Sequence, residues 1–176
     1  MLDLSFRIPQ KARLVVLAIT PLAILGLVNS QIMSKEAIVA DGHVVLLRLA
    51  PRDPRSLLQG DYMALRYRIA EEVASAARDA QLSDGVVVIR LDEDRVAAFE
   101  AIYDGQQLMA NQLLLRFRKR GDSVRLASDA FFFEEGEWPT YQGAVYGELA
   151  VNDDGEAVLT GLRGGDRQKL GPVPDQ

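Results

Sequence analysis

The stretch VVVIRLDEDRVAAFEAIY, residues 86–103, has the pattern of a β-hairpin in this 176-residue chain. Its two arms are rich in β-branched and aromatic residues, and the polar run DEDR between them has the composition of a turn. The pattern predicts two antiparallel strands joined as a hairpin. Two later stretches repeat it: LLLRFRKR and SVRLAS flank Gly121-Asp122, and AVYGELAV and EAVLTGL flank NDDG, a good turn sequence. Three hairpins in series predict a mostly antiparallel sheet, a sandwich or a partly open barrel.

Upstream of the hairpins, the period of the apolar residues changes. HVVLLRL (43–49) and YMALRYRI (62–69) alternate with period two and predict strands. In AEEVASAARDAQ (70–81) the apolar residues recur on one helical face, and Glu71 and Glu72 stand near the start, where acids suit the helix dipole. The fold class is therefore predicted as mainly β with one amphipathic helix, an α+β domain.

Residues 14–34 form a run of 21 residues without a charge. As a helix this run would be roughly 30 Å long, about the thickness of the hydrocarbon core of a bilayer. Pro21 is acceptable inside a membrane helix. Because Arg7, Lys11 and Arg13 precede the run, the positive-inside rule predicts a cytoplasmic N-terminus and an extracytoplasmic remainder.

Two alternatives compete with this transmembrane helix. A cleaved signal peptide needs a small-residue cleavage site, for which Val28-Asn29-Ser30 is a poor match. A buried core helix would normally show a polar stripe, and the run has none. The predicted organisation is a cytoplasmic stub and transmembrane anchor (1–36), an extracytoplasmic β-rich domain (37–170) and a tail (171–176).

Composition excludes several classes of function. The chain has no cysteine and one histidine, His43, so disulfides, thiolate chemistry and multi-histidine metal sites are ruled out. The formal net charge is −5; the first 34 residues carry +2, which leaves −7 on the remainder. Such an acidic domain argues against nucleic acid as a partner. We expect no metal and no cofactor.

The segment PRDPRSLLQGDYMALRY (51–67) joins a stiff, charged loop to the second predicted strand. In a structural interpretation, Asp61 and Arg52 or Arg55 hold the loop in place. In a functional interpretation, the loop and the strand are a recognition surface with Arg55, Tyr62 and Tyr67 as contacts, since Arg and Tyr are frequent in binding hot spots.

GDYMALRY resembles the signature of the GDYXXLXY protein family, and FFFEEGEWPTYQGAVYGELAVNDDGEAVLTGL resembles that family's C-terminal half. The matching or candidate binding residues are Arg52, Asp53, Arg55, Gly60, Asp61, Tyr62, Leu65, Tyr67, Phe132, Phe133, Glu135, Gly136, Tyr141, Tyr146, Gly147 and Glu148. The resemblance implies a single-pass protein of the bacterial inner membrane, with its C-terminal domain in the periplasm. It also implies a multi-pass membrane protein as partner, because members are encoded beside such proteins, and it brings no catalytic residues.

Enzymatic alternatives have few candidates. Ser56 with Lys119 would be a serine–lysine pair, and Asp61 with Glu134 and Glu135 a carboxylate site. The aromatic residues Phe131–Phe133, Trp138, Tyr141 and Tyr146 predict core packing first and a ligand groove second. We therefore expect a non-enzymatic, membrane-anchored interaction module, with an envelope hydrolase or an aromatic-groove ligand sensor as alternatives.

Overall fold

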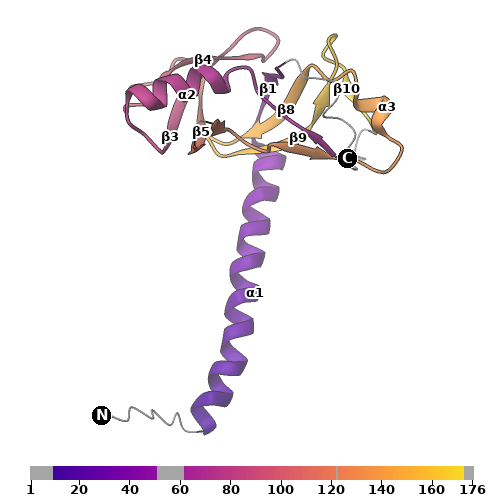
Figure 1. The fold of residues 1–176 in the computed structure, drawn as a ribbon. Helices are drawn as coiled ribbons and strands as arrows, with labels where there is room; N and C mark the ends of the chain where they lie inside the picture. Colours follow the sequence, from indigo (N-terminus) through magenta and orange to yellow (C-terminus); the bar gives the residue numbers. More distant parts are fainter. Residues whose placement is uncertain (1–9, 51–61, 122, 173–176) are drawn as a thin grey trace. The chain divides into compact units, whose positions relative to one another are not determined.

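The computed structural model describes residues 10–50, 62–121 and 123–172. The chain divides into two compact units, residues 1–37 and 38–176. The first unit is built by helix α1 (Gln10–Asp41), whose last turn belongs to the second unit (Figure 1). Described side chains between residues 17 and 37 are exposed although they are largely apolar, which does not fit a helix of a soluble core. The window Ile19–Asp41 is long and apolar enough to cross a membrane, a property shared by signal sequences.

Gly42 directly follows the last residue of α1. Its amide donates a hydrogen bond to the carbonyl of Ile38 (3.0 Å), and a Cβ at this position would clash with the same carbonyl oxygen. Strand β1 begins at the next residue. The chain therefore passes from the long helix into the β unit through a single glycine.

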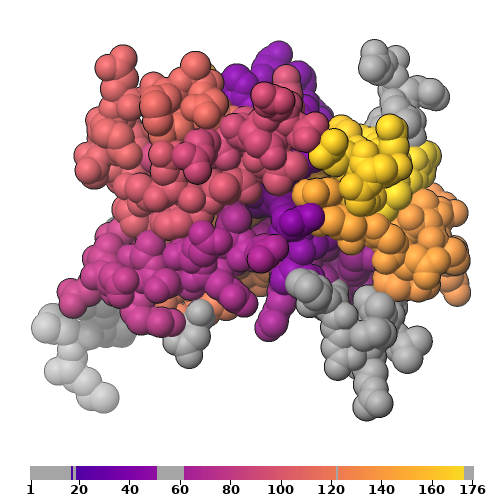
Figure 2. All heavy atoms as spheres, turned by 90° about the horizontal axis from the view of Figure 1, so that it is seen from above, coloured from indigo at the N-terminus to yellow at the C-terminus, as the bar shows by residue number. Residues whose placement is uncertain are grey.

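Two four-stranded antiparallel sheets form the second unit. The first sheet has the order β1-β8-β9-β10 and the second the order β4-β3-β5-β6. The strands of the first sheet are β1 (His43–Arg48), β8 (Tyr146–Val151), β9 (Ala157–Arg163) and β10 (Lys169–Leu170). Those of the second are β3 (Asp84–Leu91), β4 (Ala97–Ile102), β5 (Gln112–Arg120) and β6 (Ser123–Arg125). In Figure 2 the second sheet's segments (pink to red) and the C-terminal strands (orange to yellow) occupy opposite sides.

Three smaller elements complete the unit: helix α2 (Ala70–Asp79), the ribbon of β2 (Tyr62–Ala64) with β7 (Ala130–Phe132), and the short helix α3 (Trp138–Tyr141). Helix α2 packs on β4 and β6 through Val73 and Ala77, which are fully buried. One hydrophobic core unites all these parts, with Leu47, Leu149 and Leu162 from the first sheet and Ile89 and Leu115 from the second.

Backbone hydrogen bonds join the two sheets at two places. The amide of Leu46 on β1 donates to the carbonyl of Arg95 (2.9 Å), and the amide of Arg116 on β5 donates to the carbonyl of Gly155 (2.7 Å). Arg95 lies in the β3–β4 turn and Gly155 in the β8–β9 turn. A strand of each sheet is thus hydrogen-bonded to a hairpin turn of the other sheet, and one hydrophobic core unites the two sheets.

The sequence predictions agree with this architecture in most respects. The mainly β, antiparallel class is confirmed, as are the three hairpins β3–β4, β5–β6 and β8–β9 and the helix at residues 70–79. The strand predicted over 62–69 was too long: β2 ends at Ala64, and only Tyr67 makes a further bridge, to Leu49. The chain changes pairing partner there, from β7 to the end of β1.

Candidate functional site

The described part of the motif segment alternates between exposed and buried side chains. Tyr62, Arg66 and Arg68 are exposed, whereas Met63, Leu65 and Tyr67 are buried. This is the period-two alternation predicted from the sequence. One side of the segment therefore faces the core, and the other presents an aromatic ring and two cations to solvent.

Tyr62 forms an exposed aromatic pair with Phe132. The two residues are register partners on β2 and β7, and their ring centroids are 5.7 Å apart. Their exposed fractions are 42% and 74%. A phenylalanine exposed to this extent loses the stabilisation that burial of its ring would provide, so the pair suits a surface that another molecule covers.

Tyr67 is buried in the core, so its side chain is not part of the exposed surface on which a contact role was predicted for it. Its hydroxyl donates to the carbonyl of Ser128 (3.0 Å), and its ring lies against Gly147, where a Cβ would come within 3.0 Å of Cε1. Burial, with a smaller contribution from the charge of Asp129, raises the pKa of Tyr67 well above its ordinary value. Tyr67 of the GDYMALRY motif and Gly147 of the C-terminal stretch thus fit each other in the core.

An aromatic cluster beside the ribbon contains the other predicted residues of this region. Tyr141 makes an edge contact with Phe131 (centroids 5.0 Å apart) and stacks on Phe133 (5.3 Å), which also contacts Trp138 (6.3 Å). All four rings pack against the hydrophobic core. The core-packing interpretation is confirmed for these four residues and is wrong for Phe132, which is exposed, whereas a ligand groove stays a prediction.

The acidic residues next to this cluster lie in a solvated turn. Glu134, Glu135 and Gly136 are exposed, and Gly136 has a φ of +89°, which favours glycine. Burial, followed by the charges of Glu137 and Glu134, raises the pKa of Tyr141. In the described ranges, no group of three or more His, Asp and Glu side chains is placed to hold a metal ion.

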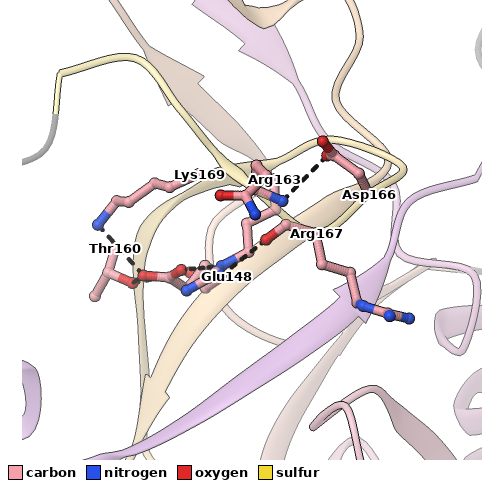
Figure 3. A network of polar contacts seen from close by, with 7 residues as sticks. Glu148, Thr160, Arg163, Asp166, Arg167 and Lys169 are labelled. Atoms are coloured by element: carbon pink, nitrogen blue, oxygen red, sulfur yellow. Dashed lines mark hydrogen bonds and ion pairs between the residues drawn. The ribbon is translucent and has the colours of Figure 1, made fainter.

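Glu148 is the charged residue that the described chain buries, with 7% of its side chain exposed. Figure 3 shows Thr160, Arg163 and Lys169 converging on it from β9 and β10. Arg163 Nε pairs with Oε2, Thr160 Oγ1 donates to Oε1 (3.1 Å), and Lys169 Nζ lies 3.4 Å from Oε1. Lys169 reaches the carboxylate across Gly161, where a Cβ would meet Lys169 Cε at 3.1 Å.

The cations around Glu148 outweigh the effect of its burial. Burial alone would raise the pKa of the carboxyl, but the hydrogen bond and charge of Arg163, the charge of Lys169 and the hydrogen bond of Thr160 hold that pKa below its usual value. Arg163 also donates from Nη1 to the carbonyl of Arg167 (2.9 Å), and Arg167 pairs with Asp94 (2.8 Å) in the β3–β4 turn. The network therefore extends from the first sheet to the second.

The remaining predictions have simple outcomes. Arg52, Asp53, Arg55, Ser56, Gly60 and Asp61 lie outside the described residues, so the loop contacts and both hydrolase pairs stay predictions. His43 has Asp153 as its neighbour (Nε2–Oδ1 3.3 Å), and both side chains are largely exposed.

Sequence reasoning missed Thr160, Arg163 and Lys169, because a bulge between Glu148 and Leu149 sets the register that brings them together.

These features define a class: a mainly β protein of two antiparallel four-stranded sheets, preceded by one long apolar helix. The model of the GDYXXLXY protein family matches residues 24–162, and the chain belongs to this family. No curated protein and no solved structure matches the chain.

Proposed function

We propose that this protein is a non-enzymatic interaction module, anchored in the bacterial inner membrane by α1, that binds a membrane protein partner with its extracytoplasmic β unit. The exposed Tyr62–Phe132 pair is the observation that carries the proposal. Aromatic side chains at the centre of an interface supply much of its binding energy. An apolar helix of this length suits a single-pass anchor, and the basic residues Arg7, Lys11 and Arg13 favour a cytoplasmic N-terminus.

A crosslinking experiment in native membranes tests the proposal. A photoreactive amino acid replaces Phe132 in the full chain, and crosslinked products are identified by mass spectrometry. We expect one membrane protein to dominate the products, and the Tyr62→Ala substitution to reduce its yield at least about fivefold, as loss of a hot-spot ring does.

Met109 provides the matched control, because its side chain is also apolar and exposed (58%) but lies in a loop between β4 and β5. A crosslinker at Met109 should give no dominant product. If Phe132 and Met109 give the same scattered products, the aromatic pair is not a binding surface and the proposal fails.

A further inference from the structure

A row of cations crosses the first sheet on the face opposite to Leu47, Leu149 and Leu162, with the buried Tyr146 between the exposed Arg48 and the partly exposed Arg163 and Lys169. Arg48, Tyr146, Arg163 and Lys169 are successive register partners on β1, β8, β9 and β10. Directly paired residues of antiparallel strands place their side chains on the same face of a sheet. Neighbouring residues on these strands, such as Leu47, Leu149 and Leu162, point into the core instead. We call Arg68, Arg48, Tyr146, Arg163 and Lys169 the basic row.

Arg68 extends the row beyond β1. Its amide donates to the carbonyl of Arg48 (2.8 Å), next to the bridge between Leu49 and Tyr67. Arg48 and Arg68 are both exposed, as is Tyr62. The basic row thus begins in the same chain segment, residues 62–68, as the exposed Tyr62.

The charge of the row is opposite to that of the chain. Arg163 and Lys169 pair with Glu148, whereas Arg48 and Arg68 do not; counted with Glu148 and the nearby Asp166, the four cations leave a net charge of +2 in a chain of net charge −5. The guanidinium of Arg48 lies over the ring of Tyr146, with 5.6 Å from Cζ to the centroid. Within the described ranges, no hydrogen bond or ion pair engages the side chains of Arg48 and Arg68. The nearby acid Asp166 accepts a hydrogen bond from the amide of Gln168 in the β9–β10 turn.

We propose that the basic row binds an extended, acidic segment of the partner protein. Five positions at the strand spacing of about 4.8 Å span roughly 19 Å, the length of about six residues of extended chain. Arginines bind carboxylates in a bidentate manner, and an arginine stacked on a tyrosine presents such a site with its side chain already ordered. This inference rests on the proposed function, because it names the chemistry of the same partner.

A binding measurement with a defined probe tests the row. Fluorescence anisotropy measures binding of a labelled hexaglutamate peptide to the full chain in nanodiscs of zwitterionic phosphatidylcholine. We expect the double variant Arg48→Glu, Arg68→Glu to bind at least about tenfold more weakly, because attraction becomes repulsion at two positions. Equal thermal midpoints of variant and wild type establish that the variant is folded.

The matched control is Arg118→Glu, Arg120→Glu, which changes the net charge equally at two exposed positions of β5. We expect this control to bind the peptide within about twofold of the wild type, since its charges lie on the other sheet. Equal losses in both double variants, or no binding by the wild type, would overturn the proposal.

Crosslinking separates this inference from the proposed function. A photoreactive residue at Arg68 in native membranes should capture the same partner as one at Phe132, through a peptide rich in Asp and Glu. Capture from Phe132 alone overturns the basic row and leaves the proposed function standing, whereas capture from neither position removes both. If the Arg48→Glu, Arg68→Glu variant instead loses affinity only for phosphatidylglycerol nanodiscs, the row binds lipid and the proposal is wrong.

Discussion

At the scale of single residues, the buried ring of Tyr67 leaves room only for a glycine at position 147. A Cβ at position 147 would lie 3.0 Å from Tyr67 Cε1 and 3.5 Å from Leu159 Cδ1, so no other residue fits without a shift of the buried ring. We expect Gly147→Ala to destabilise the protein by about 1–3 kcal/mol, as overpacking of a core does. Thermal or urea unfolding of the full chain in detergent measures the effect.

Gly143→Ala is the control for this prediction, because nothing lies within 4 Å of a Cβ at Gly143. Its free energy of unfolding should stay within about 0.5 kcal/mol of the wild type. Equal effects of the two substitutions would contradict the tight contact between Tyr67 and Gly147.

Glu148 makes stability depend on pH at the acid end. Its pKa in the folded protein lies below the ordinary value of about 4.3, so its contribution is complete above that value and is lost as the pH falls through the folded pKa. Glu148→Gln should lower the free energy of unfolding at pH 7 by about 1–3 kcal/mol, because Arg163 and Lys169 lose their ionised partner. Between pH 7 and pH 3, the free energy of unfolding should also fall less steeply with decreasing pH for the variant than for the wild type. We call this part of the pH dependence the acid limb.

Glu100→Gln on β4 is the matched substitution, because Glu100 is an exposed glutamate of the second sheet. It should leave both the stability at pH 7 and the shape of the acid limb close to those of the wild type. An acid limb for Glu148→Gln that parallels the wild type would show that the carboxylate does not contribute as described.

At the scale of elements, the β8–β9 turn has a second role besides reversing the chain. Gly155 has a φ of +79°, and a Cβ there would come within 3.0 Å of the backbone of Leu114 and Leu115 on β5. Gly155→Ala should therefore destabilise the protein by at least about 2 kcal/mol, from backbone strain and from the clash with the second sheet together.

Gly105→Ala isolates the strain, because Gly105 also has a positive φ (+97°) but nothing within 4 Å of its Cβ position. Its effect should be about 1 kcal/mol, the backbone contribution alone. The Arg116–Gly155 hydrogen bond indicates that the β8–β9 turn holds the two sheets together. If Gly105→Ala and Gly155→Ala lower the free energy of unfolding equally, this role of the turn is contradicted.

The sequence predicts local elements well, because a hairpin depends on neighbouring residues. The NDDG segment forms the turn that its sequence predicts. Asn152 Oδ1 accepts a hydrogen bond from the amide of Glu156, and Gly155 has a positive φ. The pairing of β1 with β8 was beyond local reasoning, since it joins residues about a hundred positions apart. The short strands β7 and β10 carry too few residues for a period to be recognised.

The candidate site was predictable in part, for the same reason. The alternation in YMALRY places Tyr62 and Tyr67 on opposite faces, which follows from period two alone. That Tyr67 lies on the buried face comes from the structure. That Phe132 pairs with Tyr62 depends on a contact between strands 70 residues apart. The partners of Glu148 depend on a bulge, which shifts register by one residue and leaves no mark in a single sequence.

At the scale of the whole molecule, α1 determines where the protein resides if it serves as an anchor. Leu22→Arg with Leu25→Arg places two charges in the middle of its apolar run, each opposing insertion by about 2.5–3.5 kcal/mol. We expect the variant to leave the carbonate-washed membrane pellet, whereas Leu22→Ala with Leu25→Ala should remain there. Recovery of the wild type as a shortened, soluble chain would show a cleaved signal sequence instead.

The most direct test of the membrane-anchored arrangement uses the absence of cysteine from the chain. Met109→Cys in the exposed β4–β5 loop and Ser5→Cys before the helix each supply one thiol for a membrane-impermeant maleimide. On intact spheroplasts, we expect the Met109→Cys protein to react at once and the Ser5→Cys protein to react only after lysis. Protection of Met109→Cys until the membrane is broken would contradict an extracytoplasmic β unit tethered by α1.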